Sequence, residues 1–171
     1  LKIIASTKKK MNQGILIFCP LLLKMNEVTR AKGIIHKARV SFIVVAYEKM
    51  LISTLLRAKE LASRGIDLFA SPALKFFLYN DISREAFYNN PECLENFIQL
   101  DDNDIWTALK VWSRHSDKVL STLSAGMINR NIFKVEISTE PISEERKKEL
   151  TLQISEQLNI PLSEARYFIS T

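Results

Sequence analysis

Two histidines, His36 and His115, are the only imidazole side chains in this sequence of 171 residues. A metal centre that polarises a phosphate and activates water is built from several imidazoles and carboxylates. Lys37 follows His36, and Ser116 separates His115 from Asp117, so neither histidine is followed directly by an aspartate. We therefore predict that this sequence by itself binds no metal and contains no catalytic residues.

Three neighbouring carboxylates, Asp101, Asp102 and Asp104, are the next candidates for chemistry. Their segment lacks the glycine and the final glutamate of a calcium-binding loop. Aspartates are typical of helix N-termini, where they accept hydrogen bonds from unpaired amides. We interpret this cluster as a helix cap, and His115 as a structural residue at the end of the same helix.

Nucleophilic and phosphate-cradling motifs are not recognisable either. The four glycines are isolated from one another, at Gly14, Gly33, Gly65 and Gly126. Neither a dinucleotide fingerprint nor a P-loop can be built from them. Cys19 and Cys93 have no histidine nearby in the sequence, and they are expected to be reduced thiols in a cytoplasmic protein.

Composition indicates a globular, helix-rich chain, with 47% hydrophobic residues, 25% charged residues and few glycines and prolines. The longest apolar run, residues 14–23, is interrupted by Pro20 and is too short for a bilayer, which needs about 20 residues. No membrane association is expected. The positive charge is concentrated in residues 1–43, which carry nine Lys/Arg and the single acid Glu27.

Local signals divide the remainder into a helical body, residues 44–131, and a small α/β lobe, residues 132–171. In the body, residues 44–64 are expected to form a long helix that Gly65 ends. Its predicted buried face comprises Val44, Tyr47, Leu51, Leu55, Ala58 and Ala62. Shorter helices are expected after Ser71, Asn90 and Asp101, and across residues 118–127.

The predicted lobe has strand–helix–strand order. Residues 132–137 alternate apolar and polar side chains, which favours a strand. A helix is expected after Ser143, ending at Asn159, and residues 167–169 are predicted to form a second strand that the terminus truncates. Residues 1–43 sustain neither the periodicity of a helix nor the alternation of a strand. We interpret them as a divergent basic segment, poorly ordered or non-native.

Residues 44–171 resemble the C-terminal region of bacterial HD-domain phosphohydrolases of the deoxynucleoside triphosphate triphosphohydrolase type. The similar stretches are residues 45–51, 57–61, 68–70, 101–112 and 128–135. The resemblance implies a mainly α fold, the helical C-terminal part of an HD-type fold ending in the small lobe. It also implies that the complete enzyme hydrolyses dNTPs to deoxynucleoside and triphosphate with a divalent metal and forms a homo-oligomer.

The HD metal ligands of that family normally precede this region, so this chain alone is expected to be inactive. One functional segment carries over by resemblance. It is Arg130-Asn131-Ile132-Phe133-Lys134, which is similar to a segment in the vertebrate SAM- and HD-domain triphosphohydrolase family. There an arginine and a lysine contact an activating nucleotide at a subunit interface. The resemblance thus implies that Arg130 and Lys134 contact a regulatory nucleotide; alternatively, both side chains only flank the strand.

Residues 6–43 depart from the family pattern, and three explanations stay open: a shifted reading frame, a truncated gene or a divergent insertion. Two other functions also stay open. The chain is either a noncatalytic helical module that binds a protein or a nucleotide through its small α/β lobe, or a protein that binds anionic surfaces through residues 1–43. Binding of nucleic acid is not expected, because this basic segment has few aromatic residues for base stacking.

Overall fold

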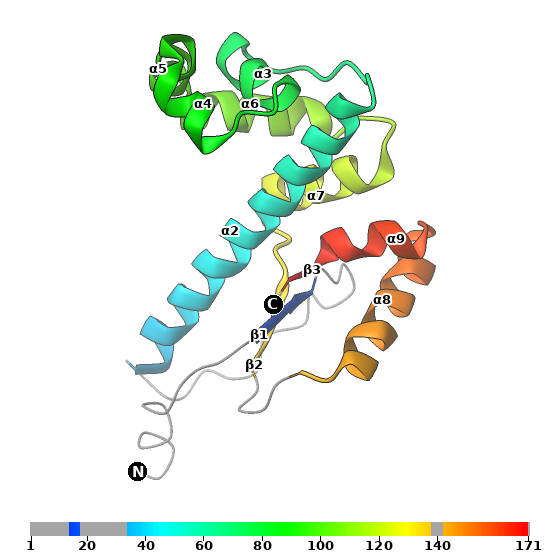
Figure 1. The fold of residues 1–171 in the computed structure, drawn as a ribbon. Helices are drawn as coiled ribbons and strands as arrows, with labels where there is room; N and C mark the ends of the chain where they lie inside the picture. Colours follow the sequence, from blue (N-terminus) through cyan, green and yellow to red (C-terminus); the bar gives the residue numbers. More distant parts are fainter. Residues whose placement is uncertain (1–13, 18–33, 138–141, 171) are drawn as a thin grey trace. The chain divides into compact units, whose positions relative to one another are not determined.

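The computed structural model describes residues 14–17, 34–137 and 142–170, and it describes side chains from Ile43 to Lys134 and from residue 142 to Ser170. These residues form two compact units (Figure 1). Unit 1 combines the residues up to Met50 with those from Asn131 onward, and unit 2 comprises Leu51 to Arg130. The described residues are mainly helical, which confirms the predicted fold class.

Unit 2 is built from helices and the turns between them. The long helix α2 (Ile34–Ser63) begins in unit 1 and supplies its C-terminal half to unit 2. The remaining helices of the unit are α3 (Pro72–Tyr79), α4 (Arg84–Asn89), α5 (Pro91–Gln99), α6 (Asp102–Trp112) and α7 (Lys118–Ile128). The sequence predicted each of these except α4, whose six residues are too few to show a helical period.

The ends of these helices lie where capping residues were predicted. Ser71 accepts a hydrogen bond from the amide of Leu74, 3.3 Å away, and so caps α3. Asp101 caps α6 in a capping box with Asp104, which confirms the interpretation of the acidic cluster. Gly65 has a φ of +81° and follows the end of α2, a left-handed conformation that favours glycine.

The core of unit 2 is apolar and close to fully buried. Its largest side chains are Leu68, Leu109, Trp112, Leu120, Leu123 and Met127, each at most 1% exposed. The indole Nε1 of Trp112 donates to the carbonyl oxygen of Phe69 over 2.9 Å. This bond ties the loop after α2 to α6, and it satisfies a polar group that would otherwise be costly to bury.

The buried face of α2 differs from the predicted one. Val44 was expected to be buried, but it is 59% exposed. The buried positions are Ala46, Met50, Ser53, Thr54, Arg57, Ala58, Leu61 and Ala62, at helical spacing. The prediction counted only apolar residues, whereas Thr54 and Arg57 are buried because they have polar partners elsewhere in the unit.

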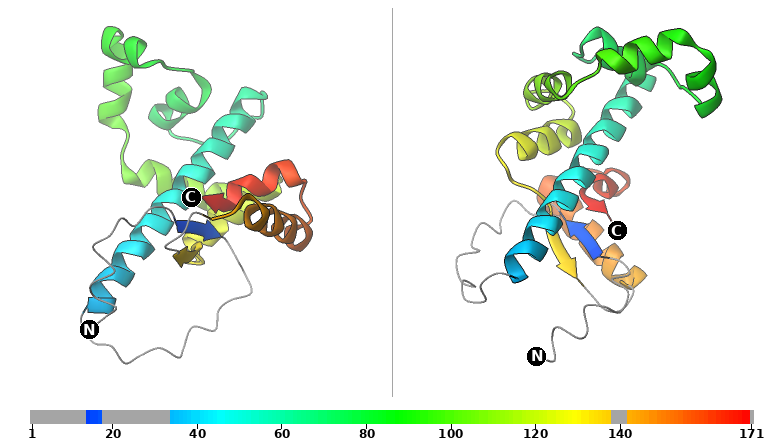
Figure 2. Two further views of the ribbon diagram at one scale, coloured as in Figure 1. Left: turned by 60° about the horizontal axis from the view of Figure 1, so that its bottom comes forward. Right: turned by 90° about the vertical axis from the view of Figure 1, so that its left-hand side faces the viewer.

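Unit 1 contains a three-stranded sheet in the order β2-β1-β3 (Figure 2). The central strand β1 (Gly14–Ile17) pairs antiparallel with β2 (Lys134–Ile137), with Leu16 opposite Val135. It also pairs antiparallel with β3 (Ile169–Ser170), with Ile17 opposite Ile169. The two predicted strands are therefore joined through a third, which lies in the segment for which the sequence predicted no element.

Two helices and a 3₁₀ turn follow β2 in unit 1. They are α8 (Glu144–Leu158), α9 (Leu162–Ala165) and η1 (Arg166–Phe168). Ser143 caps α8, and Asn159, with a φ of 48°, ends it, as the sequence predicted. Tyr167 and Phe168 were expected to begin a strand over residues 167–169, but they belong to η1, and the strand begins at Ile169. The buried side chains of this region include Leu150, Ile154 and Phe168.

Across the described part of the chain, no helix is both long enough and apolar enough to cross a membrane.

Candidate functional site

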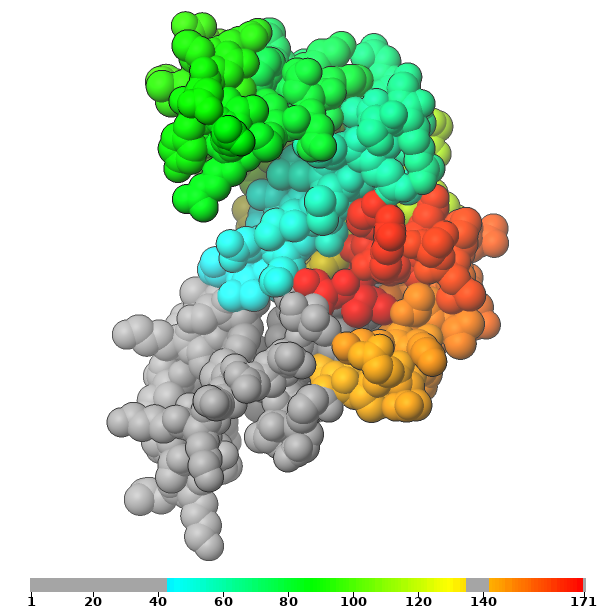
Figure 3. All heavy atoms as spheres, viewed as in Figure 1, coloured from blue at the N-terminus to red at the C-terminus, as the bar shows by residue number. Residues whose placement is uncertain are grey.

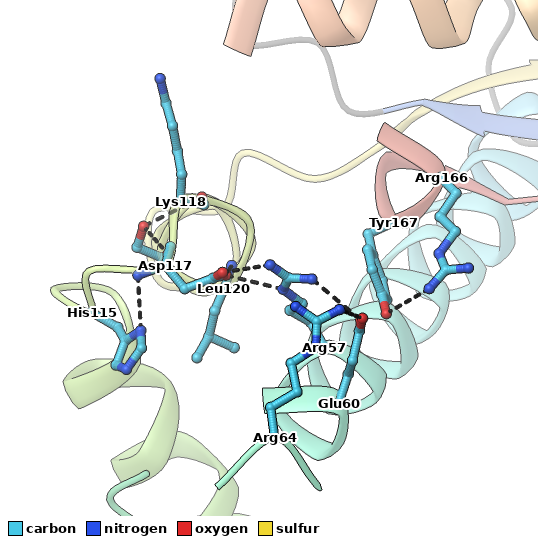
Figure 4. Close-up of polar contacts among 10 residues, drawn as sticks. Arg57, Glu60, Arg64, His115, Asp117, Lys118, Leu120, Arg166 and Tyr167 are labelled. Atoms are coloured by element: carbon cyan, nitrogen blue, oxygen red, sulfur yellow. Dashed lines mark hydrogen bonds and ion pairs between the residues drawn. The ribbon is translucent and has the colours of Figure 1, made fainter. Parts of the chain in front are cut away.

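A buried arginine on α2 is the centre of the largest charged network described within unit 2 (Figure 4). Arg57 is only 2% exposed, and it lies on the face of α2 that also presents apolar side chains to the core. Its guanidinium faces Asp117, which precedes α7. Because charged side chains are rarely buried unless they are paired, this position calls for a partner, and Asp117 is that partner.

Arg57 and Asp117 form a bidentate ion pair. Arg57 Nε donates to Oδ1 of Asp117 over 3.2 Å, and Nη2 donates to Oδ2 over 2.5 Å. A second acceptor lies on the same helix, because Arg57 Nη1 donates to Oε2 of Glu60 over 3.2 Å. Arg64 contacts the other carboxylate oxygen of Glu60. Positive and negative groups thus alternate from the core toward the surface.

Asp117 has a second role as the N-cap of α7. Its Oδ1 accepts a hydrogen bond from the amide of Leu120 over 2.8 Å. Burial raises the pKa of Asp117, but the hydrogen bonds from Arg57 and Leu120 and the positive charge of Arg57 outweigh burial and hold the pKa below its usual range. The carboxylate is therefore ionised at neutral pH, and both of its oxygens are already engaged.

His115 lies in the turn before Asp117 and not within the helix that precedes it. Helix α6 ends at Trp112, and the imidazole Nδ1 of His115 accepts a hydrogen bond from the amide of Asp117 over 3.0 Å. In this bond the ring nitrogen Nδ1 is the acceptor and the backbone N–H is the donor. The histidine orders the turn that delivers Asp117 to Arg57.

This network links elements and shows no group poised for catalysis. Arg57 joins α2 to the start of α7, and the carboxylate oxygens of Asp117 accept from donors of the protein itself. In the parts of the chain that the structure describes, no three His, Cys, Asp or Glu residues are grouped so that they could hold a metal ion. The side chain of His36 lies outside the described side chains.

The sequence reasoning missed Arg57 as a site residue. Its position three and four residues from the buried Thr54 and Leu61 places it on the core-facing side of α2. That spacing, together with Asp117 as the evident N-cap of a predicted helix, was the signal available. The spacing indicated that Arg57 is buried, but it did not identify the partner Asp117, which lies 60 positions away in the sequence.

The two residues predicted to contact a regulatory nucleotide lie on opposite sides of the boundary between the units. Arg130 ends unit 2, is exposed and has a φ of 59°, in the left-handed region. Lys134 is the exposed first residue of β2 in unit 1. Phe133 beside it is 2% exposed and anchors the chain there. The nucleotide contact stays a prediction from the resemblance.

Comparison with known proteins supports one relationship. No family model matches the chain, and no curated protein matches it. Among solved structures, the crystal structure of a phosphohydrolase from Bacteroides thetaiotaomicron VPI-5482 is 81% identical, with a TM-score of 0.71. The match covers 72% of this chain and 31% of the phosphohydrolase, so this chain spans about a third of that protein. The matched residues are a close counterpart of part of a phosphohydrolase.

Proposed function

We propose that this chain is the helical C-terminal part of an HD-type phosphohydrolase whose complete form hydrolyses dNTPs to deoxynucleoside and inorganic triphosphate. The observation that carries the proposal is the 81% identity to part of a Bacteroides phosphohydrolase. The choice of dNTP as substrate rests on the sequence resemblance to dNTP triphosphohydrolases. Cytoplasmic location and homo-oligomerisation belong to the same proposal.

The chain's own contribution would be scaffolding. A divalent metal in the complete enzyme would polarise the phosphate and activate water. The described residues do not fit such a metal, because they bring together no group of three or more potential ligands. No step of the reaction is therefore assigned to them. Arg57, Asp117 and the capped helices would instead hold unit 2 rigid in the larger protein.

Product analysis tests this proposal most sharply. The segment of the Bacteroides phosphohydrolase that matches this chain is replaced by the matching residues of this chain, and the hybrid is incubated with a dNTP mixture and Mg²⁺ or Mn²⁺. We expect deoxynucleoside and inorganic triphosphate in equal amounts. Release of pyrophosphate or orthophosphate from dNTPs would contradict the reaction type. Hydrolysis of other phosphate esters without any from dNTPs would contradict the substrate class.

The unaltered Bacteroides protein is the matched control for this experiment. If it releases triphosphate and the hybrid does not, the segments are not equivalent and the assignment of this chain to such an enzyme fails. If neither protein releases triphosphate while both hydrolyse another phosphate ester, the phosphohydrolase relationship stands and the dNTP proposal falls.

One observation favours a second candidate function, a noncatalytic module that binds a protein partner. Helix α4 has no buried residue, and α5 has Cys93 as its buried residue, yet both helices carry large apolar side chains. Exposed apolar side chains gathered on adjacent helices are characteristic of interaction surfaces. This function is compatible with the first, because a scaffold can also bind a partner.

A further inference from the structure

The surface formed by α4 and α5 is unusually apolar for a pair of helices in contact with solvent. The exposed fractions are 74% for Tyr88, 51% for Leu94, 56% for Phe97 and 73% for Ile98. Figure 3 shows the green atoms of this part of unit 2 at the molecular surface. We name these four residues the α4–α5 face.

Three of the four residues share one side of α5. Leu94, Phe97 and Ile98 are spaced at i, i+3 and i+4, which places them on a single stripe of the helix. A stripe of this kind ordinarily packs against a core, but here it is exposed. An apolar helical stripe that faces solvent is the feature that a second amphipathic helix recognises.

Aromatic packing gives the face a defined shape. The ring of Phe87 meets Phe97 edge to face, with centroids 5.5 Å apart, and it meets Tyr88 in the same way at 6.0 Å. These contacts hold α4 against α5 and fix the exposed rings in place. An ordered aromatic surface loses less conformational entropy on binding than a flexible one.

The charge around the face identifies the chemistry of the partner. Residues 80–104 contain seven acidic residues and the single base Arg84. Glu85, Glu92 and Glu95 are exposed on the two helices themselves. A helix with its side chains is about 10 Å across, which is close to the Debye length at 0.1 M salt, so these charges act on any molecule docked to α5.

We propose that the α4–α5 face binds a cationic amphipathic helix of a partner protein, one whose apolar stripe is flanked by Lys and Arg. The negative charge argues against anionic lipid and nucleic acid. It also argues against a second copy docked face to face, because a two-fold interface would place like charges opposite one another. The inference goes beyond the proposed hydrolysis and does not depend on it.

A designed probe helix tests the proposal on the full chain. The probe is a fluorescent peptide of about 18 residues, or five turns, with leucine at i, i+3 and i+4 and lysine elsewhere. A second peptide has glutamate at every lysine position. We expect the lysine peptide to raise fluorescence anisotropy with saturation and the glutamate peptide to bind at least about tenfold more weakly. Equal binding of both peptides, or binding of neither, would overturn the proposal.

Two double variants separate the apolar and charged contributions. Leu94→Ser with Ile98→Ser removes exposed apolar side chains, and Glu92→Gln with Glu95→Gln removes charge. Each is expected to weaken the lysine peptide by about tenfold, and the second also to flatten the salt dependence. Because all four side chains are exposed, the variants should fold, and circular dichroism checks this.

Matched controls lie in unit 1. Leu152→Ser with Leu162→Ser alters two similarly exposed leucines, at 49% and 51%, and Glu145→Gln with Glu156→Gln removes two exposed charges. Both should leave peptide binding unchanged, and equal losses would mean nonspecific attraction and defeat the proposal. Sedimentation equilibrium without peptide provides the last test. A dimer that dissociates on Leu94→Ser with Ile98→Ser would overturn the proposal in favour of a second copy.

Discussion

The helices of unit 2 and the sheet of unit 1 depend on different kinds of contact along the sequence. In unit 2, helices begin and end at residues whose side chains cap them, and neighbouring helices are separated by short turns. In unit 1, the central strand β1 pairs with strands from the far end of the sequence, as Gly14 does with Ile137 and Leu16 with Ser170. Local hydrogen bonding can be recognised in a sequence, whereas pairing between distant segments leaves no local periodic trace.

The buried ion pair of unit 2 is a contact between distant residues in the unit that is otherwise specified locally. Arg57 and Asp117 are 60 positions apart, yet Arg57 lies in α2 and Asp117 caps α7, two helices with ordinary local signals. Their contact is as non-local as many strand pairings. The packing of helices and strands depends on residues far apart in the sequence in both units. Unit 2 therefore differs from the sheet of unit 1 only in that its individual helices are specified by nearby residues.

The largest effect is expected from breaking this ion pair. Arg57→Met leaves Asp117 partly buried without its counter-charge, and we expect the free energy of unfolding to fall by about 3–5 kcal/mol. Lys59→Met is the matched control, because Lys59 lies on the same helix and pairs with Asp81 at the surface. The control should cost no more than about 1 kcal/mol. Urea unfolding of both variants measures the difference, and equal losses would refute the buried role of Arg57.

A proline in β1 tests whether the two units can be perturbed separately. Leu16 lies opposite Val135 on one side and Ser170 on the other, so Leu16→Pro removes an amide from the central strand at a cost of about 3 kcal/mol. Hydrogen exchange should show lost protection in β2 and β3. Amides of α6 and α7 should keep theirs, and loss of protection there as well would mean that the units unfold as one.

The pH dependence of stability should reveal the charge of Asp117. Its folded-state pKa lies below the unfolded value of about 3.9, so its contribution is complete above that value and disappears as pH falls through the folded pKa. Asp117→Asn keeps a capping side chain but removes the charge, and it should cost about 2 kcal/mol at pH 7. Urea midpoints from pH 7 to pH 3 should show this difference shrinking in acid. A constant difference would contradict the assignment.

The smallest effects are expected from the helix caps, one in each unit. Ser71→Ala removes the cap of α3, and Ser143→Ala removes that of α8. Each should lower the free energy of unfolding by about 1 kcal/mol. Replacement of either serine by Asp or Asn should restore most of the loss, and thermal unfolding of the paired variants measures this. A failure of rescue would show that hydrogen bonding to the amide is not what the serine provides.

Much of the helical architecture was predictable because its signals are local. Ser71, Asp101 and Ser143 each cap the helix that the sequence placed after them. The start of α2 was not predictable in this way. It lies at Ile34, ten residues before the predicted start, where the sequence shows neither a sustained period nor a clear cap.

The candidate site was less predictable than the fold, for a physical reason. Thr54 and Arg57 are buried on α2, but their side chains alone argue for exposure. Burial is tolerated because Met127 of α7 and Asp117, the N-cap of α7, bond to them, and no property of α2 specifies that packing. The similarity to part of a phosphohydrolase was recognised from stretches of the scaffold, and no candidate site residue reveals it.

Triphosphate release by this chain alone, beside the Bacteroides hybrid that contains its matching segment, tests the central claim most directly. Both proteins are incubated at equal concentration with dNTPs and a divalent metal. We expect stoichiometric deoxynucleoside and triphosphate from the hybrid and none from this chain, because its described residues offer no metal-binding group. Metal-dependent release of triphosphate by this chain alone would contradict the proposal that it is a noncatalytic part of such an enzyme.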